Sequence, residues 1–337
     1  MRTRAIFGCS GTSLTAAERA FFASSKPWGF ILFGRNLLDR EQARALTGEL
    51  RAAIGDDAAP ILIDQEGGRV ARLKPPHWTE RPSAARFGAL YETKAEAGRE
   101  AVYLNARLIA HDVTGIGVNV NCAPLLDVPV AGADPIIGDR AFGRDPAQII
   151  DLGRAFIEGL VEGGVLPVMK HIPGHGRAAA DSHVALPRVS SVAEELSATD
   201  FVTFRSLNHC PMAMTAHVVY EAIDPQRPAT TSPKVIRDIV RGEIGFDGLL
   251  MSDDLSMGAL SGPISVRTKA ALFAGCDVVL HCNGSLDEME EVAGELKPLE
   301  GPAMRRADHA LAQIKGELRF DRAAAEARLA ELLSLAA

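Results

Sequence analysis

Eight short apolar runs constrain the fold of this chain more than any other feature. Most of them are nearly continuous rather than alternating, which is typical of strands buried on both faces. Helical patterns separate most of the runs, and alternation of strand with helix predicts a parallel sheet. Eight such units in about 300 residues match a (β/α)8 barrel. The runs cover residues 5–8, 29–34, 60–64, 118–126, 165–169, 212–217, 248–252 and 277–281.

Local signals indicate where several helices begin. Thr15 and Ser191 are each followed three residues later by glutamate, the pattern of a capping box. Ser232 precedes Pro233, which predicts an N-cap with proline at the first helical position. We expect one domain over residues 1–337, with a helical C-terminal region over about 285–337 that wraps the barrel.

Polar side chains, most of them ionisable, collect after the apolar runs and not before them. The carboxyl ends of parallel strands meet at one face of a barrel, so this distribution predicts a site at that face. A doubly wound open sheet is the main alternative, but no G-x-G-x-x-G fingerprint follows the first run. The side chains concerned are Asp64, Gln65, Glu66, Asp127, Lys170, His171, His217, Asp253, Asp254, His281 and Asn283.

Composition excludes several classes of function. A formal net charge of −7 argues against a nucleic-acid partner. No segment reaches 18 uninterrupted apolar residues, so we expect no membrane span. The apolar run after the basic N-terminus is too short for a signal-peptide core. The five cysteines are widely spaced and include no CxxC pair, so we expect reduced thiols and a cytoplasmic protein.

The densest group of titratable residues follows the fifth run, with K-H-I-P-G-H-G at 170–176 and D-S-H at 181–183. Lysine at the end of an interior strand needs an anionic or hydroxyl-rich partner, because burying its charge alone is costly. Asp181 beside His183 makes a competent general acid/base, although a surface salt bridge has the same pattern. His175 lies between glycines and is better explained as a structural residue that holds the loop by hydrogen bonds.

Two adjacent carboxylates, Asp253 and Asp254, follow the seventh run. We expect Asp253 to point into the barrel mouth, where a carboxylate can act as a nucleophile, a base or a metal ligand. For Asp254, a role in the site and the capping of a helix N-terminus are equally good interpretations.

A further group of charges surrounds a Gly-Gly turn after the third run. Asp64 is the best candidate there to accept hydrogen bonds from a polyol, and Arg72 either clamps Asp64 or binds ligand. Glu66 and Arg69 are close enough in sequence to pair with each other. Arg140, in the segment G-D-R-A-F-G, is a weaker candidate for the same mouth.

Together these motifs resemble the bacterial β-N-acetylglucosaminidases of glycoside hydrolase family 3. The D-S-H triplet separates this branch from the β-glucosidases of the family, which use a distant glutamate as acid/base. Ile172 departs from the pattern, because the family usually has an aromatic residue there. The matching segments are residues 29–36, 64–72, 138–140, 170–176, 181–183, 245–255 and 274–277.

The resemblance implies a retaining double displacement. Asp253 would attack the anomeric carbon and form a glycosyl-enzyme intermediate. His183 would protonate the leaving oxygen and then activate water, with Asp181 orienting it. The carboxylate-separation rule for glycosidases therefore does not apply.

The resemblance also implies a substrate. Single-domain cytoplasmic members release terminal N-acetylglucosamine from peptidoglycan fragments, the GlcNAc-1,6-anhydroMurNAc-peptides, during cell-wall recycling. We therefore expect a small carbohydrate substrate, no cofactor, no metal and a monomeric enzyme. The residues implied to hold the hydroxyls of the terminal sugar are Asp64, Arg72, Arg140, Lys170 and His171.

Two alternatives from other classes remain open at this point. A metal-dependent barrel hydrolase would use His171, His175, His183 and Asp253 as zinc ligands, although Lys170 beside them would repel a cation. A non-catalytic sugar-binding barrel is the other, and the intact Asp181, His183 and Asp253 argue against it.

Overall fold

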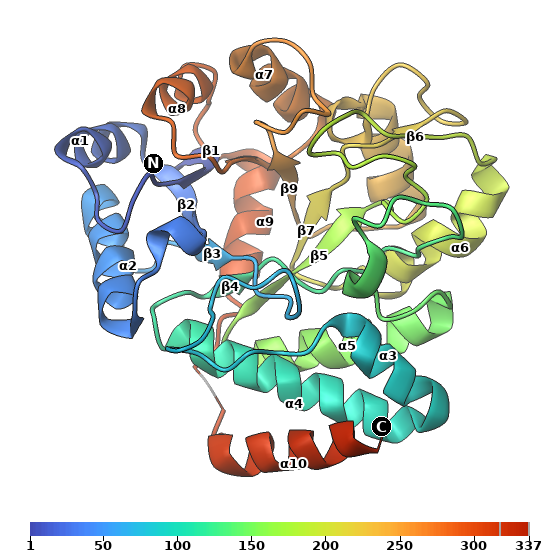
Figure 1. Ribbon diagram of the computed structural model, residues 1–337. Helices are drawn as coiled ribbons and strands as arrows, with labels where there is room; N and C mark the ends of the chain where they lie inside the picture. Colours follow the sequence, from blue (N-terminus) through green and yellow to red (C-terminus); the bar gives the residue numbers. More distant parts are fainter. Residues whose placement is uncertain (317, 336–337) are drawn as a thin grey trace.

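Eight parallel strands close into a barrel in a computed structural model of the protein, which describes residues 1–316 and 318–335 (Figure 1). The first strand pairs with both the second and the last, which confirms the predicted barrel over the open sheet. Each predicted run overlaps one strand, and β1, β2, β5 and β9 extend beyond their runs by two or three residues. In chain order they are β1 (Thr3–Gly8), β2 (Pro27–Leu32), β3 (Ile61–Ile63), β4 (Val120–Asn121), β5 (Leu166–Ile172), β7 (Met212–Thr215), β9 (Leu249–Asp254) and β10 (Val278–His281).

Helices surround the ring of strands, apart from α9, which lies across its centre (Figure 1). They are α1 (Ala16–Ser25), α2 (Arg40–Ile54), α3 (Ala84–Thr93), α4 (Ala95–Thr114), α5 (Pro146–Glu162), α6 (Ala193–Ser206), α7 (Ile264–Ala274), α8 (Leu286–Ala293), α9 (Gly301–Leu311) and α10 (Arg322–Ser334). A π-helix, η4 (Val235–Glu243), lies between β7 and β9, and short 3₁₀ turns are η1 (Gly34–Asn36), η2 (Gly138–Arg140) and η3 (Ala229–Thr231).

Helices begin at all three predicted positions, and the predicted side-chain cap is present at two of them. Thr15 forms the complete capping box with Glu18. The Ser232 hydroxyl accepts a hydrogen bond from the Val235 backbone N–H, 3.1 Å away, as an N-cap does. At the third position a helix does begin, at Ala193, but the capping box at Ser191 was wrong, because α6 is capped at Val192 without a side-chain bond and the Ser191 hydroxyl instead accepts from Arg177.

Both faces of the strands are buried, which explains their continuous apolar runs. Along β1, Ile6 points into the barrel interior, whereas Ala5 and Phe7 pack in the shell between strands and helices. The interior is filled by branched and sulfur-containing side chains from all eight strands. The barrel is therefore a packed core, and a ligand can enter only from an end.

Helix α9 closes one end of the barrel. Its Ala303, Ala307 and Ala310 belong to the interior cluster, and Leu299 just before it bonds the backbone of Arg2 at the start of β1. In Figure 1, α9 lies across the centre of the ring of strands. The expectation that the C-terminal helices wrap the barrel was wrong for α9. Its small side chains let its backbone approach the interior residues, so the helix plugs the N-terminal end.

The remaining C-terminal helices lie outside the barrel, α8 beside α7 and α10 on α4. The single domain expected over residues 1–337 stays a prediction, and Glu317, Ala336 and Ala337 within that range lie outside the described residues. No helix in the described part of the chain combines the length and the apolar character that crossing a membrane requires.

Candidate active site

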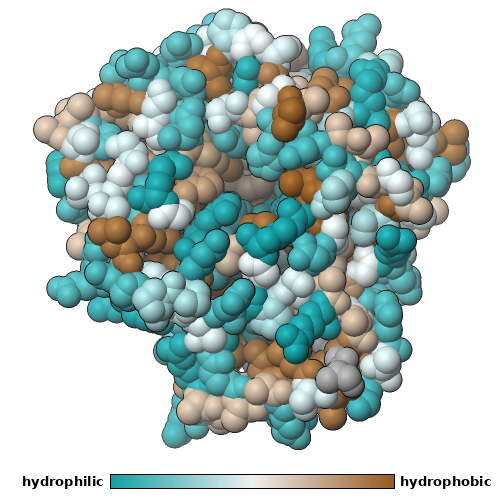
Figure 2. Space-filling model, viewed as in Figure 1, coloured by the Kyte–Doolittle hydropathy of each residue, from teal (hydrophilic) through white to brown (hydrophobic). Residues whose placement is uncertain are grey.

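A cavity of about 340 Å³ opens at the carboxyl ends of the strands, within the size range of small-molecule sites. Figure 2 shows a hollow near the centre of this face with hydrophilic residues on its rim. Its inner surface includes Met214 and Leu280, which belong to the packed interior. Of the residues singled out in the sequence, the cavity is lined by Asp64, Arg72, Arg140, Lys170, His171, His183 and Asp253, and Asp181 bonds one of them.

A chain of buried charges forms one wall of the cavity. Lys170 Nζ lies 2.8 Å from Asp64 Oδ1 and 2.7 Å from Glu66 Oε1. Arg140 donates to both Glu66 oxygens, at 2.9 and 2.8 Å. The expected Glu66–Arg69 pair was wrong, because Arg69 reaches Asp139 and nearby backbone carbonyls instead. The Gly-Gly turn separates Glu66 from Arg69, and Glu66 points inward with the strand.

These contacts fix the charge states of the wall. Burial alone would raise the pKa of Asp64, but Lys170 and Arg72 hold that pKa well below its usual range. Burial would likewise raise the pKa of Glu66, and Lys170 with Arg140 lowers it to about 2. Burial alone would lower the pKa of Lys170, yet the two carboxylates raise it. All members are therefore ionised at neutral pH.

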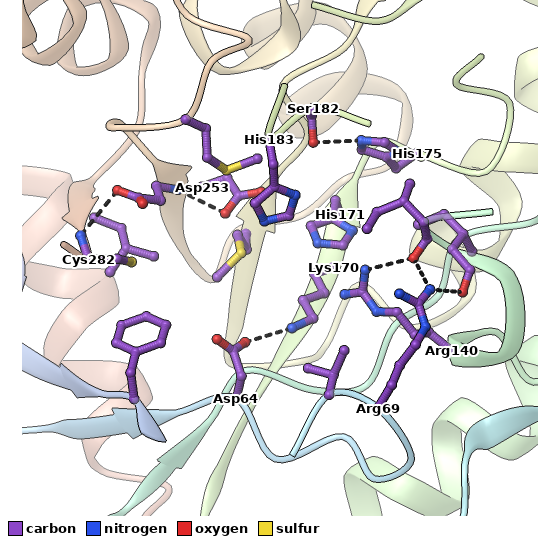
Figure 3. A pocket seen from close by; sticks show the side chains of 18 of the residues that line it. Asp64, Arg69, Arg140, Lys170, His171, His175, Ser182, His183, Asp253 and Cys282 are labelled. Carbon is purple, nitrogen blue, oxygen red and sulfur yellow. Dashed lines mark hydrogen bonds and ion pairs between the residues drawn. The ribbon is translucent and has the colours of Figure 1, made fainter. Parts of the chain in front are cut away.

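Arg72 connects this wall to an aromatic ring at the mouth. Its Nη2 donates to Asp64 Oδ2 at 3.2 Å, and its guanidinium carbon lies 5.3 Å from the centroid of the Phe33 ring. The Arg72 Nε atom is buried and meets no hydrogen-bond partner within the described residues. Arg72 thus clamps Asp64, one of the two roles expected for it. Figure 3 shows Asp64 and Lys170 facing each other across the base of the cavity.

Asp127 organises the loop that follows β5. Its Oδ2 lies 2.8 Å from His171 Nδ1, and its Oδ1 accepts from the backbone N–H groups of His171 and His175 at 3.2 and 2.6 Å. Sequence reasoning noted Asp127 only as the end of a run. Its position after β4, the strand that pairs with β5, was the signal that could have revealed its role.

His175 takes the structural role expected of it. Its Nε2 lies 3.0 Å from the hydroxyl of Ser182, and both residues are buried. Burial, together with the neighbouring His171, lowers the pKa of His175 to about 4. It is therefore neutral at pH 7 and ties the two ends of the loop together.

His183 and Asp181 form the predicted pair at the cavity entrance. Asp181 Oδ1 lies 2.7 Å from His183 Nδ1 and also accepts from the His183 backbone N–H at 2.9 Å. The His183 side chain is 62% exposed, and it lines the cavity. Binding Nδ1 to a carboxylate leaves Nε2 available toward the cavity.

Asp253 lies at the end of β9, inside the cavity (Figure 3). Its Oδ1 accepts from the Asp254 backbone N–H at 2.8 Å. Burial alone would raise the pKa of Asp253, but His217 and His171 hold it below its usual value. Asp253 is thus an ionised carboxylate at the base of the site.

Asp254 plays a different part from its neighbour. The suggestion that it caps a helix was wrong, because β9 runs through Asp254 and α7 begins ten residues later at Ile264. Its carboxylate accepts instead from the backbone N–H groups of Ser256 and Cys282, each at 3.1 Å. Asp254 therefore fixes the segment after β9 to the end of β10.

Sequence reasoning also missed the support given by His217. Its Nδ1 lies 2.7 Å from Thr230 Oγ1, and its Nε2 lies 3.0 Å from the Asp254 carbonyl. In the described part of the chain, no three His, Cys, Asp or Glu side chains gather as a metal-binding group. Among the described residues, His171, His175, His183 and Asp253 do not form such a group, so the zinc ligand set left open by the sequence does not assemble.

Comparisons with known proteins identify the family of this chain. The glycosyl hydrolase family 3 N-terminal domain matches residues 12–315. The chain is 39% identical to a β-hexosaminidase of Alkalilimnicola ehrlichii over 88% of this chain and 84% of that protein. It is also 39% identical to a β-hexosaminidase of Methylococcus capsulatus, over 94% and 93%. NagZ from Neisseria gonorrhoeae in complex with N-trifluoroacetyl-D-glucosamine superposes with a TM-score of 0.88 at 31% identity, over 98% of each chain. The chain therefore belongs to glycosyl hydrolase family 3, within its β-hexosaminidase group.

Proposed function

We propose that this protein is a retaining exo-β-N-acetylglucosaminidase that releases terminal N-acetylglucosamine through a covalent glycosyl-enzyme intermediate. The observation that carries the proposal is the placement of Asp253 and the His183–Asp181 pair on one cavity with the charged wall of Asp64 and Lys170. An ionised carboxylate, a histidine held by a carboxylate and hydroxyl-binding charges are the parts that a double displacement needs.

The shape of the cavity supports exo action. Packed side chains and helix α9 close the barrel below it, so a sugar can enter from the mouth but a polymer cannot pass through. A terminal residue would bind with its hydroxyls against Asp64, Arg72, Lys170 and His171, because charged groups make strong hydrogen bonds to hydroxyls. Arg140 also lines the cavity and is assigned to the same hydroxyl-binding set, while its three nitrogens donate to Glu66 and to the Ile136 carbonyl.

In the first step, Asp253 attacks the anomeric carbon while His183 Nε2–H protonates the departing oxygen. The second Asp253 oxygen accepts no hydrogen bond from the described residues, which leaves it available for attack. In the second step, neutral His183 takes a proton from water, which attacks the anomeric carbon and releases Asp253. Asp181 stabilises the imidazolium that donates the proton in the first step and forms again in the second.

The compound in complex with the gonococcal relative is a glucosamine derivative, which supports N-acetylglucosamine in the cavity. We assign GlcNAc-1,6-anhydroMurNAc-peptides as the natural substrates, with a role in cell-wall recycling by a cytoplasmic monomer. The test is turnover of p-nitrophenyl N-acetyl-β-glucosaminide beside the matching β-glucoside, with the anomer of the product followed by proton NMR. The proposal requires hydrolysis of the first substrate with a β-anomeric product. A protein that binds the sugar but does not hydrolyse it would be a binding module instead.

A further inference from the structure

The segment that follows Asp253 contacts the loop that carries His183. The backbone N–H of Gly258 donates to the His183 carbonyl at 3.2 Å, and the N–H of Ala259 donates to the Ser182 carbonyl at 3.1 Å. With the Ser182–His175 bond at 3.0 Å, these are the three hydrogen bonds that join residues 181–185 to the rest of the described chain. The loop that carries His183 is therefore hydrogen-bonded to the segment that directly follows the strand of Asp253.

Gly258 is required at this contact because of space. A Cβ atom at position 258 would lie 2.8 Å from the His183 carbonyl oxygen and 2.9 Å from that of Val184. Both neighbours are backbone atoms, which cannot swing aside as a side chain can. The φ angle of Gly258 lies outside the left-handed region, so backbone conformation does not demand glycine there.

The two partners differ in how firmly they are held. The segment after Asp253 is fixed to the barrel by the Asp254 carboxylate on Cys282 and by the Leu255 N–H on the Leu280 carbonyl, 2.9 Å away. The His183 loop is more open, with Val184 78% exposed. A side chain added at position 258 would therefore displace the loop rather than the segment.

We propose that Gly258 and Ser182 are positioning residues, which dock the acid/base loop so that His183 reaches the oxygen of the leaving group. Gly258 docks the loop because its N–H bonds the His183 carbonyl and because it has no side chain to collide with that carbonyl. Ser182 holds the loop through its hydrogen bond with His175. Met257, the residue before the dock, lines the cavity. One segment thus sets the positions of both catalytic partners. This inference rests on the proposed function, because it assigns His183 the acid role.

The test uses Gly258→Ala, with Gly262→Ala as its matched control. Gly262 lies in the same loop at a φ of 85°, and no atom lies within 4 Å of the Cβ it would gain. The control strains the loop backbone without touching His183. Hydrolysis is measured with aryl N-acetyl-β-glucosaminides whose leaving groups range from 2,4-dinitrophenol to phenol.

We expect Gly258→Ala to lower kcat/KM for the phenyl substrate by about 10- to 100-fold and for the dinitrophenyl substrate by less than about threefold, because only the poorer leaving group needs the acid. Gly262→Ala should leave the ratio between the two substrates at its wild-type value. Ser182→Ala should give a weaker form of the Gly258→Ala pattern, and it carries the test if Gly258→Ala does not fold.

Hydrogen exchange gives a second readout that does not depend on activity. The Val184 and Ala185 amides bond the Asp181 carbonyl inside the loop. Peptides covering 181–185 should take up deuterium faster in Gly258→Ala than in wild type or Gly262→Ala. Unchanged deuterium uptake in Gly258→Ala, or an equal loss of kcat/KM for every leaving group, would overturn the proposed positioning role of Gly258. Absence of turnover in wild type would instead refute the proposed function, and the exchange experiment would still decide the dock.

Discussion

Asp127 accepts hydrogen bonds from both the ring Nδ1 and the backbone N–H of His171, although Asp127 itself is wholly buried. Burial alone would raise the pKa of Asp127, but His171, and to a lesser extent His175, lowers it. The carboxylate keeps the proton on His171 Nδ1, so the Nε2 atom faces the cavity as a defined partner for a sugar hydroxyl.

Replacing Asp127 with asparagine should weaken sugar binding through His171. An amide cannot hold the ring and accept from two backbone N–H groups as the carboxylate does, so we expect kcat/KM to fall by about tenfold or more and stability by about 1–3 kcal/mol. The readout specific to this mechanism is the ¹⁵N chemical shift of the His171 ring, which should report a changed tautomer. Asp139→Asn, at a half-exposed acid, is the control, and an unchanged His171 tautomer in Asp127→Asn would contradict the assignment.

Removing the carboxylate of Asp253 should abolish covalent catalysis. We expect Asp253→Ala to lower kcat by several orders of magnitude, because the nucleophile is lost outright. In the wild type, a 5-fluoro or 2-fluoro sugar should trap the intermediate, and mass spectrometry of the digest should find the label on Asp253. A label on Asp254 or Glu66 would refute the assignment, and the structural role of Asp254 makes it the informative comparison.

Removing the imidazole of His183 should slow the hydrolysis of different substrates to different extents, according to their leaving groups. His183→Ala should slow glycosylation of poor leaving groups much more than of activated aryl glycosides, with deglycosylation slow for both. Asp181→Asn should give a milder version, since the ring remains but loses its carboxylate. The measurement is the dependence of kcat/KM on leaving-group pKa. Equal slopes in wild type and His183→Ala would remove His183 from the acid role.

The buried charges around Glu66 predict that the free energy of unfolding depends on pH. The pKa of Glu66 is lowered to about 2 in the folded protein, so its contribution is complete above the unfolded value of about 4.5 and is lost as the pH falls through about 2. Glu66→Gln should be less stable than wild type at pH 7 by on the order of 3 kcal/mol, and the gap should close between about pH 4.5 and 2. Denaturant unfolding at each pH measures it. The exposed Glu290→Gln should show no such gap, and a gap independent of pH in Glu66→Gln would contradict the prediction.

Local sequence patterns located most of the candidate site but not its internal pairing. Each ionisable residue chosen for lying after an apolar run lies at the carboxyl end of a barrel strand or just beyond it, because a strand packed on both faces accommodates polar side chains only where it reaches the end of the packed core. The roles of Asp127, Glu66 and His217 were not visible in this way, since each acts on a residue from another strand. The same holds for Gly258, whose partner is the loop after β5.

By itself, the sequence determined that eight apolar runs form a closed parallel barrel, because each run must bury both of its faces and the helical segments between them supply the covering layer. It also determined which end carries the chemistry. Only the tertiary structure decided that Glu66 pairs with Arg140, 74 positions away, rather than with Arg69, and that α9 plugs the barrel instead of wrapping it. Those outcomes depend on which loops the closed ring brings within hydrogen-bond distance, and a pattern local to one segment cannot contain that information.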